Sequence, residues 1–299
     1  MVPLPETVAH TGEYAAALPW TFEPWVVACL LSAAFLYFAG AWKLWRKAGI
    51  GRGLTVWQAA LFVAGWLTLC AALVSPLDAL GSRLFSAHMV QHEFLMIVAA
   101  PLFVLARPLE AWTWGLPHAW RSPVSRIAHA PPLQRAWTAL TLPLSAWAIH
   151  AAALWIWHIP VLFNAALSNE GLHALQHASF LAAALLFWWA VLGKSGERNP
   201  ALAIALLFTT MLHTGALGAL LTFSPSSWYR YDNASAFGLD PTADQQLGGL
   251  IMWIPGGLAY LAAGLAMVFR HYLVTAVDDD TPPQRRFSGP QVPRPHRPQ

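Results

Sequence analysis

The chain has 299 residues, of which 57% are hydrophobic and only 10% are charged, and it carries 17 Trp. Soluble domains have about 25% charged residues, so the composition excludes an ordinary soluble domain. The net charge of +3 does not indicate nucleic-acid binding, because the basic residues are scattered between apolar runs and form no patch with aromatic residues. We therefore expect a protein of the lipid bilayer with no nucleic-acid partner.

Seven apolar stretches of about 20 residues predict an all-α, polytopic membrane bundle with seven transmembrane helices. A helix rises about 1.5 Å per residue, so each stretch is long enough to cross about 30 Å of hydrocarbon. The predicted spans are 24–44, 55–75, 84–105, 137–157, 172–192, 200–223 and 246–269. Around the membrane domain, residues 24–272, we expect an extracytoplasmic segment, 1–23, and a disordered cytoplasmic tail, 273–299, rich in Pro and Arg.

The distribution of basic residues predicts the orientation of the bundle. Of the 17 Lys and Arg residues, 15 fall in the first, third and fifth connections and at the C-terminus. Only Arg83 and Arg230 fall on the opposite side. Because cytoplasmic loops carry an excess of Lys and Arg, we expect the N-terminus outside and the C-terminus in the cytoplasm.

Histidines are the chemically informative residues of the spans. The third and fifth spans each open with an HxxxH pair, and helical i,i+4 spacing places both imidazoles of a pair on one face. Ionisable side chains inside a membrane are expensive and usually functional. With the predicted orientation, seven histidines lie in the outer half of the bundle: His88, His92, His150, His158, His173, His177 and His213.

Because these histidines share one depth, we predict that they form a metal site. Imidazole is a suitable ligand for Zn, Cu, Fe and Ni. Met89 and Met211 offer thioethers and Cys29 and Cys70 offer thiols, which favour Cu(I), although each is also an ordinary packing residue. Asp244 is either an acceptor that fixes an imidazole tautomer or a favourable acid at a helix N-terminus. These residues favour copper without deciding the metal.

Five blocks then carry a resemblance to a known family. They read SAHMVQHEFLMIVAAPLFVLARP, WIWHIPVLFNAAL, HALQHASFLAAALLFW, LHTGALGALLTFSPSSWY and DQQLGGLIMWIPGGLAYL. In this order, from about residue 75 to 272, the chain resembles the seven-helix CtaG family of bacterial cytochrome c oxidase assembly factors.

The resemblance implies a non-enzymatic factor of the bacterial inner membrane that helps to mature a haem–copper oxidase. It implies copper supplied at the extracytoplasmic face, with oxidase subunits and a periplasmic copper donor as partners. The positions that match the family's motif histidines are His88, His92, His158, His173, His177 and His213, with Asp244 in the last block.

Three alternatives remain open from the residues. A copper-transport or resistance permease would need a polar path to the cytoplasm. A haem protein could use paired histidines as axial ligands. A di-iron membrane oxygenase would need about eight histidines and an HxxHH cluster, which this sequence lacks.

Overall fold

A computed structural model describes residues 18–231 and 234–273 of the chain, and within these ranges the secondary structure is helical with no β-strand. The prediction of an all-α bundle is therefore confirmed. Residues 1–17 of the expected N-terminal segment and residues 274–299 of the expected tail lie outside the described ranges.

Helices follow one another through short connections, and many begin at a proline, whose missing N–H costs nothing in the first helical turn. The elements are α1 Pro24–Ala48, α2 Val56–Leu73, α3 Pro76–Gly81, α4 Phe85–Glu93, η2 Phe94–Ala99, α5 Ala100–Ala106, α6 Pro108–Gly115, α7 His118–Ala128, α8 Pro131–Leu140, α9 Pro143–Trp157, α10 Pro160–Ser168, α11 Glu170–Leu192, α12 Lys194–Arg198, α13 Pro200–Thr222, η3 Ala234–Phe237, α14 Pro241–Val268 and η4 Phe269–Leu273.

Six helical stretches of the described chain are long and apolar enough to cross a membrane: Pro24–Ala48, Val56–Leu73, Phe85–Ala106, Glu170–Arg198, Pro200–Thr222 and Pro241–His271. Their outer faces are apolar; on α1, for example, Phe35 is 71% exposed and Leu31 and Phe38 are exposed beside it. Contiguous apolar surface of this extent is unstable in water and stable in lipid. The chain is a multi-pass membrane protein, and its orientation stays a prediction.

The predicted span 137–157 is wrong as a straight helix. The structure bends it by 70° between α8 and α9, and only if this bent pair counts as one span are there seven. Pro143 causes the break, because proline disfavours the helical conformation of the residue before it, and Leu142 is extended (ψ 135°). The remaining 15 residues of α9 cover about 22 Å, less than the hydrocarbon thickness.

A π-helical segment, η2, interrupts the third span immediately after Glu93. Such segments leave irregular backbone hydrogen bonding and are frequent at functional sites. Here the indole N–H of Trp188 on α11 donates to the Met96 carbonyl at 2.8 Å. This bond ties the irregular segment to α11.

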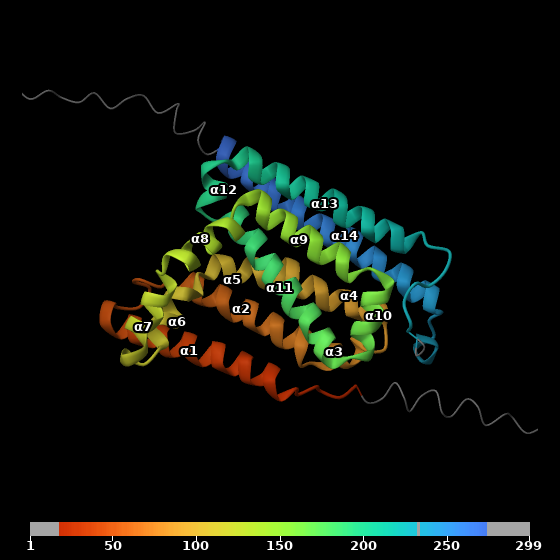
Figure 1. The fold of residues 1–299 in the computed structure, drawn as a ribbon, viewed down its shortest axis with the longest axis horizontal. Helices are drawn as coiled ribbons and strands as arrows, with labels where there is room; N and C mark the ends of the chain where they lie inside the picture. Colours follow the sequence, from red (N-terminus) through yellow and green to blue (C-terminus); the bar gives the residue numbers. More distant parts are fainter. Residues whose placement is uncertain (1–17, 232–233, 274–299) are drawn as a thin grey trace, which may run out of the picture.

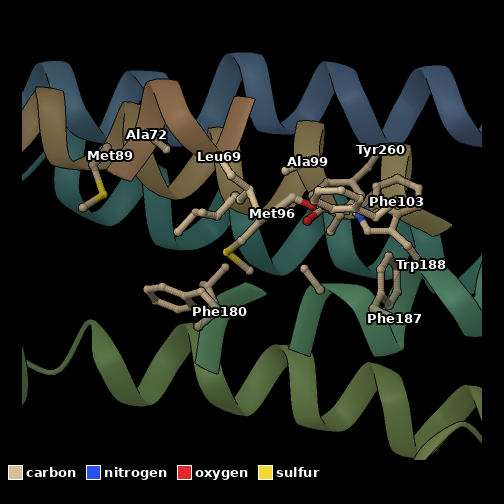
Figure 2. Packing of buried hydrophobic residues seen from close by; sticks show 14 of the residues in the cluster. Leu69, Ala72, Met89, Met96, Ala99, Phe103, Phe180, Phe187, Trp188 and Tyr260 are labelled. Atoms are coloured by element: carbon tan, nitrogen blue, oxygen red, sulfur yellow. Dashed lines mark hydrogen bonds between the residues drawn. The ribbon is translucent and has the colours of Figure 1, made fainter. Parts of the chain in front are cut away.

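The helices form two flanks around a central group. Figure 1 shows α1 and α2 on one side and α13 with α14 on the other, with α4, α5 and α11 between them. The hydrophobic core runs through this central group, and Figure 2 shows Met96, Phe180, Phe187, Trp188 and Tyr260 packed within it. The centre of the bundle is therefore built on rigid, buried elements.

Small residues allow α13 and α14 to approach closely. A Cβ built on Gly218 would lie 2.8 Å from the Gly249 carbonyl oxygen, and one built on Gly249 would lie 2.7 Å from the Gly218 carbonyl oxygen. Neither position can take a side chain unless the helices separate. Close packing of this kind is the usual basis of helix association in membranes.

We predict that Gly249→Leu destabilises the protein by about 1–3 kcal/mol, the usual cost of inserting carbons into a packed interface. The midpoint of thermal unfolding in detergent should fall by several degrees. Gly264→Leu is the matched control, because a Cβ on this glycine of the same helix meets nothing within 4 Å. Equal midpoints for the two variants would show that the contact does not hold the helix pair together.

Candidate metal centre

The first histidine pair stands on α4, whose N-terminus is held by a carboxylate from another helix. Asp244 of α14 accepts hydrogen bonds from the Phe85 N–H at 2.6 Å, the Ser86 N–H at 3.1 Å and the Ser86 hydroxyl at 2.5 Å. A carboxylate in this place satisfies the free N–H groups of the first turn and complements the helix dipole. Asp244 therefore caps α4, and its carboxylate bonds to Phe85 and Ser86.

The second pair stands at the start of α11. The Asn169 side chain accepts from the Leu172 N–H at 2.9 Å and so fixes where this helix begins. His173 and His177 then lie one turn apart on one face, with ring centroids 4.2 Å apart. By fixing where α11 begins, the Asn169 cap thus fixes the position of both imidazoles along the helix.

His158 joins from the C-terminal end of α9. Its Nδ1 lies 2.7 Å from the Leu154 carbonyl oxygen, which can only accept, so Nδ1 carries the proton and donates. This leaves the lone pair on Nε2, the nitrogen available to a metal. Tyr229 holds the backbone here, since its hydroxyl donates to the His158 carbonyl at 2.9 Å.

These three elements bring five imidazoles together. Within the first pair the ring centroids are 4.3 Å apart; between the two pairs they are 5.1–5.4 Å apart, and the fifth ring lies 6.1 Å from the nearest member of the first pair. We call this group the five-histidine cluster: His88, His92, His158, His173 and His177.

Three of the five are close enough to share one ion. Each of His88, His173 and His177 offers a ring nitrogen, and these nitrogens all lie within 4.8 Å of one another. Imidazole nitrogens that share an ion at about 2.0 Å lie about 3.3–3.5 Å apart, so side-chain movements of about 1 Å would close the triangle.

Most of the cluster's nitrogens lack a well-formed hydrogen bond inside the protein. Seven buried ring nitrogens form none of normal geometry: both of His88, beside which Gln176 and the Gly81 backbone lie, both of His92, and Nε2 of His158, His173 and His177. A buried polar group without a partner costs about 1–3 kcal/mol. The donor set is thus concentrated, buried and chemically unsatisfied, which fits a metal ion.

Apolar rings surround the cluster. Phe163 lies 5.2 Å from the His88 ring, and Phe180 lies 4.5 Å from the His92 ring. These rings place apolar surface against two of the imidazoles. Beside them, Gln176 is fully buried with neither side-chain polar atom bonded.

His150 and His213, also expected in the metal site, form a separate pair. Their rings lie 6.4 Å apart, and the Tyr260 hydroxyl lies 3.4 Å from His150 Nε2. His150 is eight residues before His158 on α9, which places it about 12 Å deeper along the helix. The expectation of one seven-histidine layer is therefore wrong, because depths that differ by two helical turns cannot meet at one ion.

The sulfur side chains also lie elsewhere. Met89 is fully buried in the core, where it packs toward Gly248 of α14, and Met211 packs toward Gly257. Cys70 is partly buried against the same core. Cys29 lines a cavity that also reaches His173 and His177, so it is the one sulfur expected in the site that shares a surface with the cluster.

Sequence reasoning missed the two glutamines that occupy equivalent places in HMVQH and HALQH. Gln91 donates to the Ala72 carbonyl at 2.7 Å and to the Asp78 carboxylate at 2.9 Å, which ties α4 to α2 and α3. Gln176 lies between the histidines of α11. In the sequence, both pairs carry a Gln three residues after the first His, and this repetition could have indicated the two positions.

Comparison with known proteins gives the family of the chain. Residues 35–273 match the family model described as cytochrome c oxidase caa3 assembly factor, which confirms the resemblance to the CtaG family. An uncharacterised protein of Mycobacterium bovis and one of Mycobacterium tuberculosis are each 29% identical over 89% of this chain and 40% of their own length. One of Mycobacterium leprae is 28% identical over 78% of this chain and 36% of its own length. The chain thus spans about 40% of these relatives, and no solved structure matches it.

We predict that Asp244→Asn lowers the free energy of unfolding by about 1–3 kcal/mol, because the amide faces N–H donors with a donor of its own. The measurement is thermal unfolding in detergent. Glu197→Gln is the control, since its ion pair with Arg270 is 3.4 Å long and exposed and should contribute less than about 1 kcal/mol. If both variants unfold like the wild type, the cap does not stabilise α4.

Proposed function

The chain belongs to the cytochrome c oxidase caa3 assembly factor family, and from this premise we propose that its five-histidine cluster binds copper and passes it to an oxidase subunit. The observation that carries the proposal is the set of seven buried imidazole nitrogens without partners. A cluster of ordinary core histidines would be expected to bond to neighbouring carbonyls or hydroxyls.

Ligand chemistry supports copper over harder metals. The cluster offers nitrogen donors alone, and imidazole suits Cu, Zn, Fe and Ni better than Mg or Ca. An oxidase of the haem–copper class requires copper during assembly, so copper is the metal that joins this donor set to the family's role. The cargo is held as a substrate and released, which requires a site that is not closed.

Graded burial of the histidines supports release. His88 is fully buried, His177 is 7% exposed, and His173 is half-buried at the edge. An ion held by these rings can exchange ligands one at a time with an incoming donor at the exposed edge. Transfer of this kind needs neither catalysis nor a redox step, in keeping with the non-enzymatic role that the family suggests.

Partner and compartment follow from the proposed orientation. If the N-terminus lies outside, the cluster lies near the extracytoplasmic surface of the bacterial inner membrane. We propose that a periplasmic donor supplies the ion there and that an oxidase subunit receives it at the same face.

Two alternatives are less well supported. A permease needs a continuous line of polar groups through both halves of the bundle, whereas the buried Thr210 and Thr214 hydroxyls of α13 donate to carbonyls of their own helix. A haem needs a flat slot between its ligands, whereas His88 contacts His92, His173 and His177 directly. A single ion suits this packing better than a macrocycle.

We predict that His88→Ala with His92→Ala weakens copper binding by more than about 100-fold, because loss of even an outer partner of a metal ligand costs about 10- to 100-fold. The measurement is copper per chain after anaerobic loading and gel filtration. In cells, the copper content of the oxidase should fall in parallel.

The matched control is His118→Ala with His129→Ala, which removes two exposed histidines from α7 and its C-terminal end. It should bind copper like the wild type. Wild-type copper content in the His88/His92 variant, with the control also unchanged, would exclude the cluster as the copper site.

A further inference from the structure

A cavity of about 660 Å³ opens between α1 and α11, which lie apart in Figure 1. Most of its wall is apolar and includes Leu30, Trp66 and Leu181. At the end where α1 and α11 begin, the lining changes to Glu23, Asp78, His173 and His177. The polar end of the cavity therefore reaches the five-histidine cluster from the side of the bundle.

Two carboxylates, Glu23 and Asp78, line this end, and the charge of Glu170 at the start of α11 acts on Glu23; we call Glu23, Asp78 and Glu170 the acidic mouth. Burial raises the pKa of Glu23, and the neighbouring charges of Asp78 and Glu170 raise it further. Within the described ranges the one ion pair shorter than 4.0 Å joins Arg270 and Glu197, so the mouth's negative charge is not neutralised by a salt bridge.

The acidic mouth is contiguous with unpartnered imidazoles. His177 is more than nine-tenths buried, lines the same cavity, and has a free Nε2. His173 lies nearer the opening, also with a free Nε2, and the charge of Asp78 acts on its ring. A cation drawn to the carboxylates would therefore meet these two rings first.

The opposite side of the cluster is closed. Tyr229 stacks on Phe85 with centroids 4.7 Å apart and lies 4.2 Å from Phe163. All three rings are buried. Together they cover the histidines on the side of α10 and the 224–231 connection, which leaves the cavity between α1 and α11 as the open approach.

We propose that the acidic mouth is the entrance through which a copper ion reaches the cluster, laterally between α1 and α11. This inference rests on the function proposed above and adds its route. Carboxylates attract a cation electrostatically. As hard oxygen donors they hold soft Cu(I) weakly and release it to imidazole. Ring contacts then lead inward, from His173 to His177 at 4.2 Å, to His88 at 5.4 Å and to His92 at 4.3 Å.

The test compares rates of copper uptake. The wild type and Glu23→Gln/Asp78→Asn would be reconstituted in nanodiscs of uncharged phosphatidylcholine and mixed anaerobically with acetonitrile-solvated Cu(I). Tryptophan fluorescence would be followed in a stopped-flow instrument. At low ionic strength the variant should load about tenfold more slowly, and the difference should shrink as salt screens the charges. Glu110→Gln/Glu197→Gln, which neutralises two exposed acids of α6 and α12, should load like the wild type.

A second variant keeps every charge and narrows the opening. Ala174 lines the cavity beside His173, so Ala174→Trp should slow loading at every ionic strength. The entrance is refuted if neither variant slows a wild type that binds copper, or if the Glu110/Glu197 control slows equally. A wild type that takes up no copper would refute the proposed function, and the route with it.

Discussion

The structure depends on one constraint: five imidazoles are packed inside an apolar bundle that offers their ring nitrogens few hydrogen-bond partners. Seven cluster nitrogens form no hydrogen bond of normal geometry with the protein, and a buried polar group costs about 1–3 kcal/mol when it stays unsatisfied. The fold nevertheless keeps them together, through the Asp244 cap on α4, the Asn169 cap on α11 and the Tyr229 bond behind His158. Caps of this kind hold the donor set in place, as the proposed copper site requires.

The same elements leave the two sides of the site unequal. Aromatic packing around Phe85, Phe163 and Tyr229 closes one side, while the cavity between α1 and α11 leaves His173 half-buried at the other. A cargo site needs this asymmetry, because an ion sealed on all sides could not be handed on. If the cluster carries copper as proposed, the graded burial of its histidines is what allows the ion to be passed on during oxidase assembly.

Sequence patterns predicted the parts of the site that depend on local geometry. The i,i+4 spacing of each HxxxH pair placed its two rings together, and the apolar stretches located six of the spans. They failed where geometry is not local. A shared outer half of the bundle did not separate His150 and His213 from the cluster, although His150 lies two helical turns from His158. A cap that joins residues 158 positions apart, Asp244 and Ser86, leaves no pattern in the chain. Pro143 accounts for a break, but the local sequence does not give the size of the bend, 70°.

Copper binding by the five-histidine cluster is tested most directly by X-ray absorption at the copper edge, on anaerobically loaded wild-type protein carrying one ion per chain. We expect a first shell of imidazole nitrogens, recognisable by outer scattering from the rings, with no sulfur. A first shell dominated by sulfur, or an imidazole shell that persists when His88, His173 and His177 are all replaced, would contradict it.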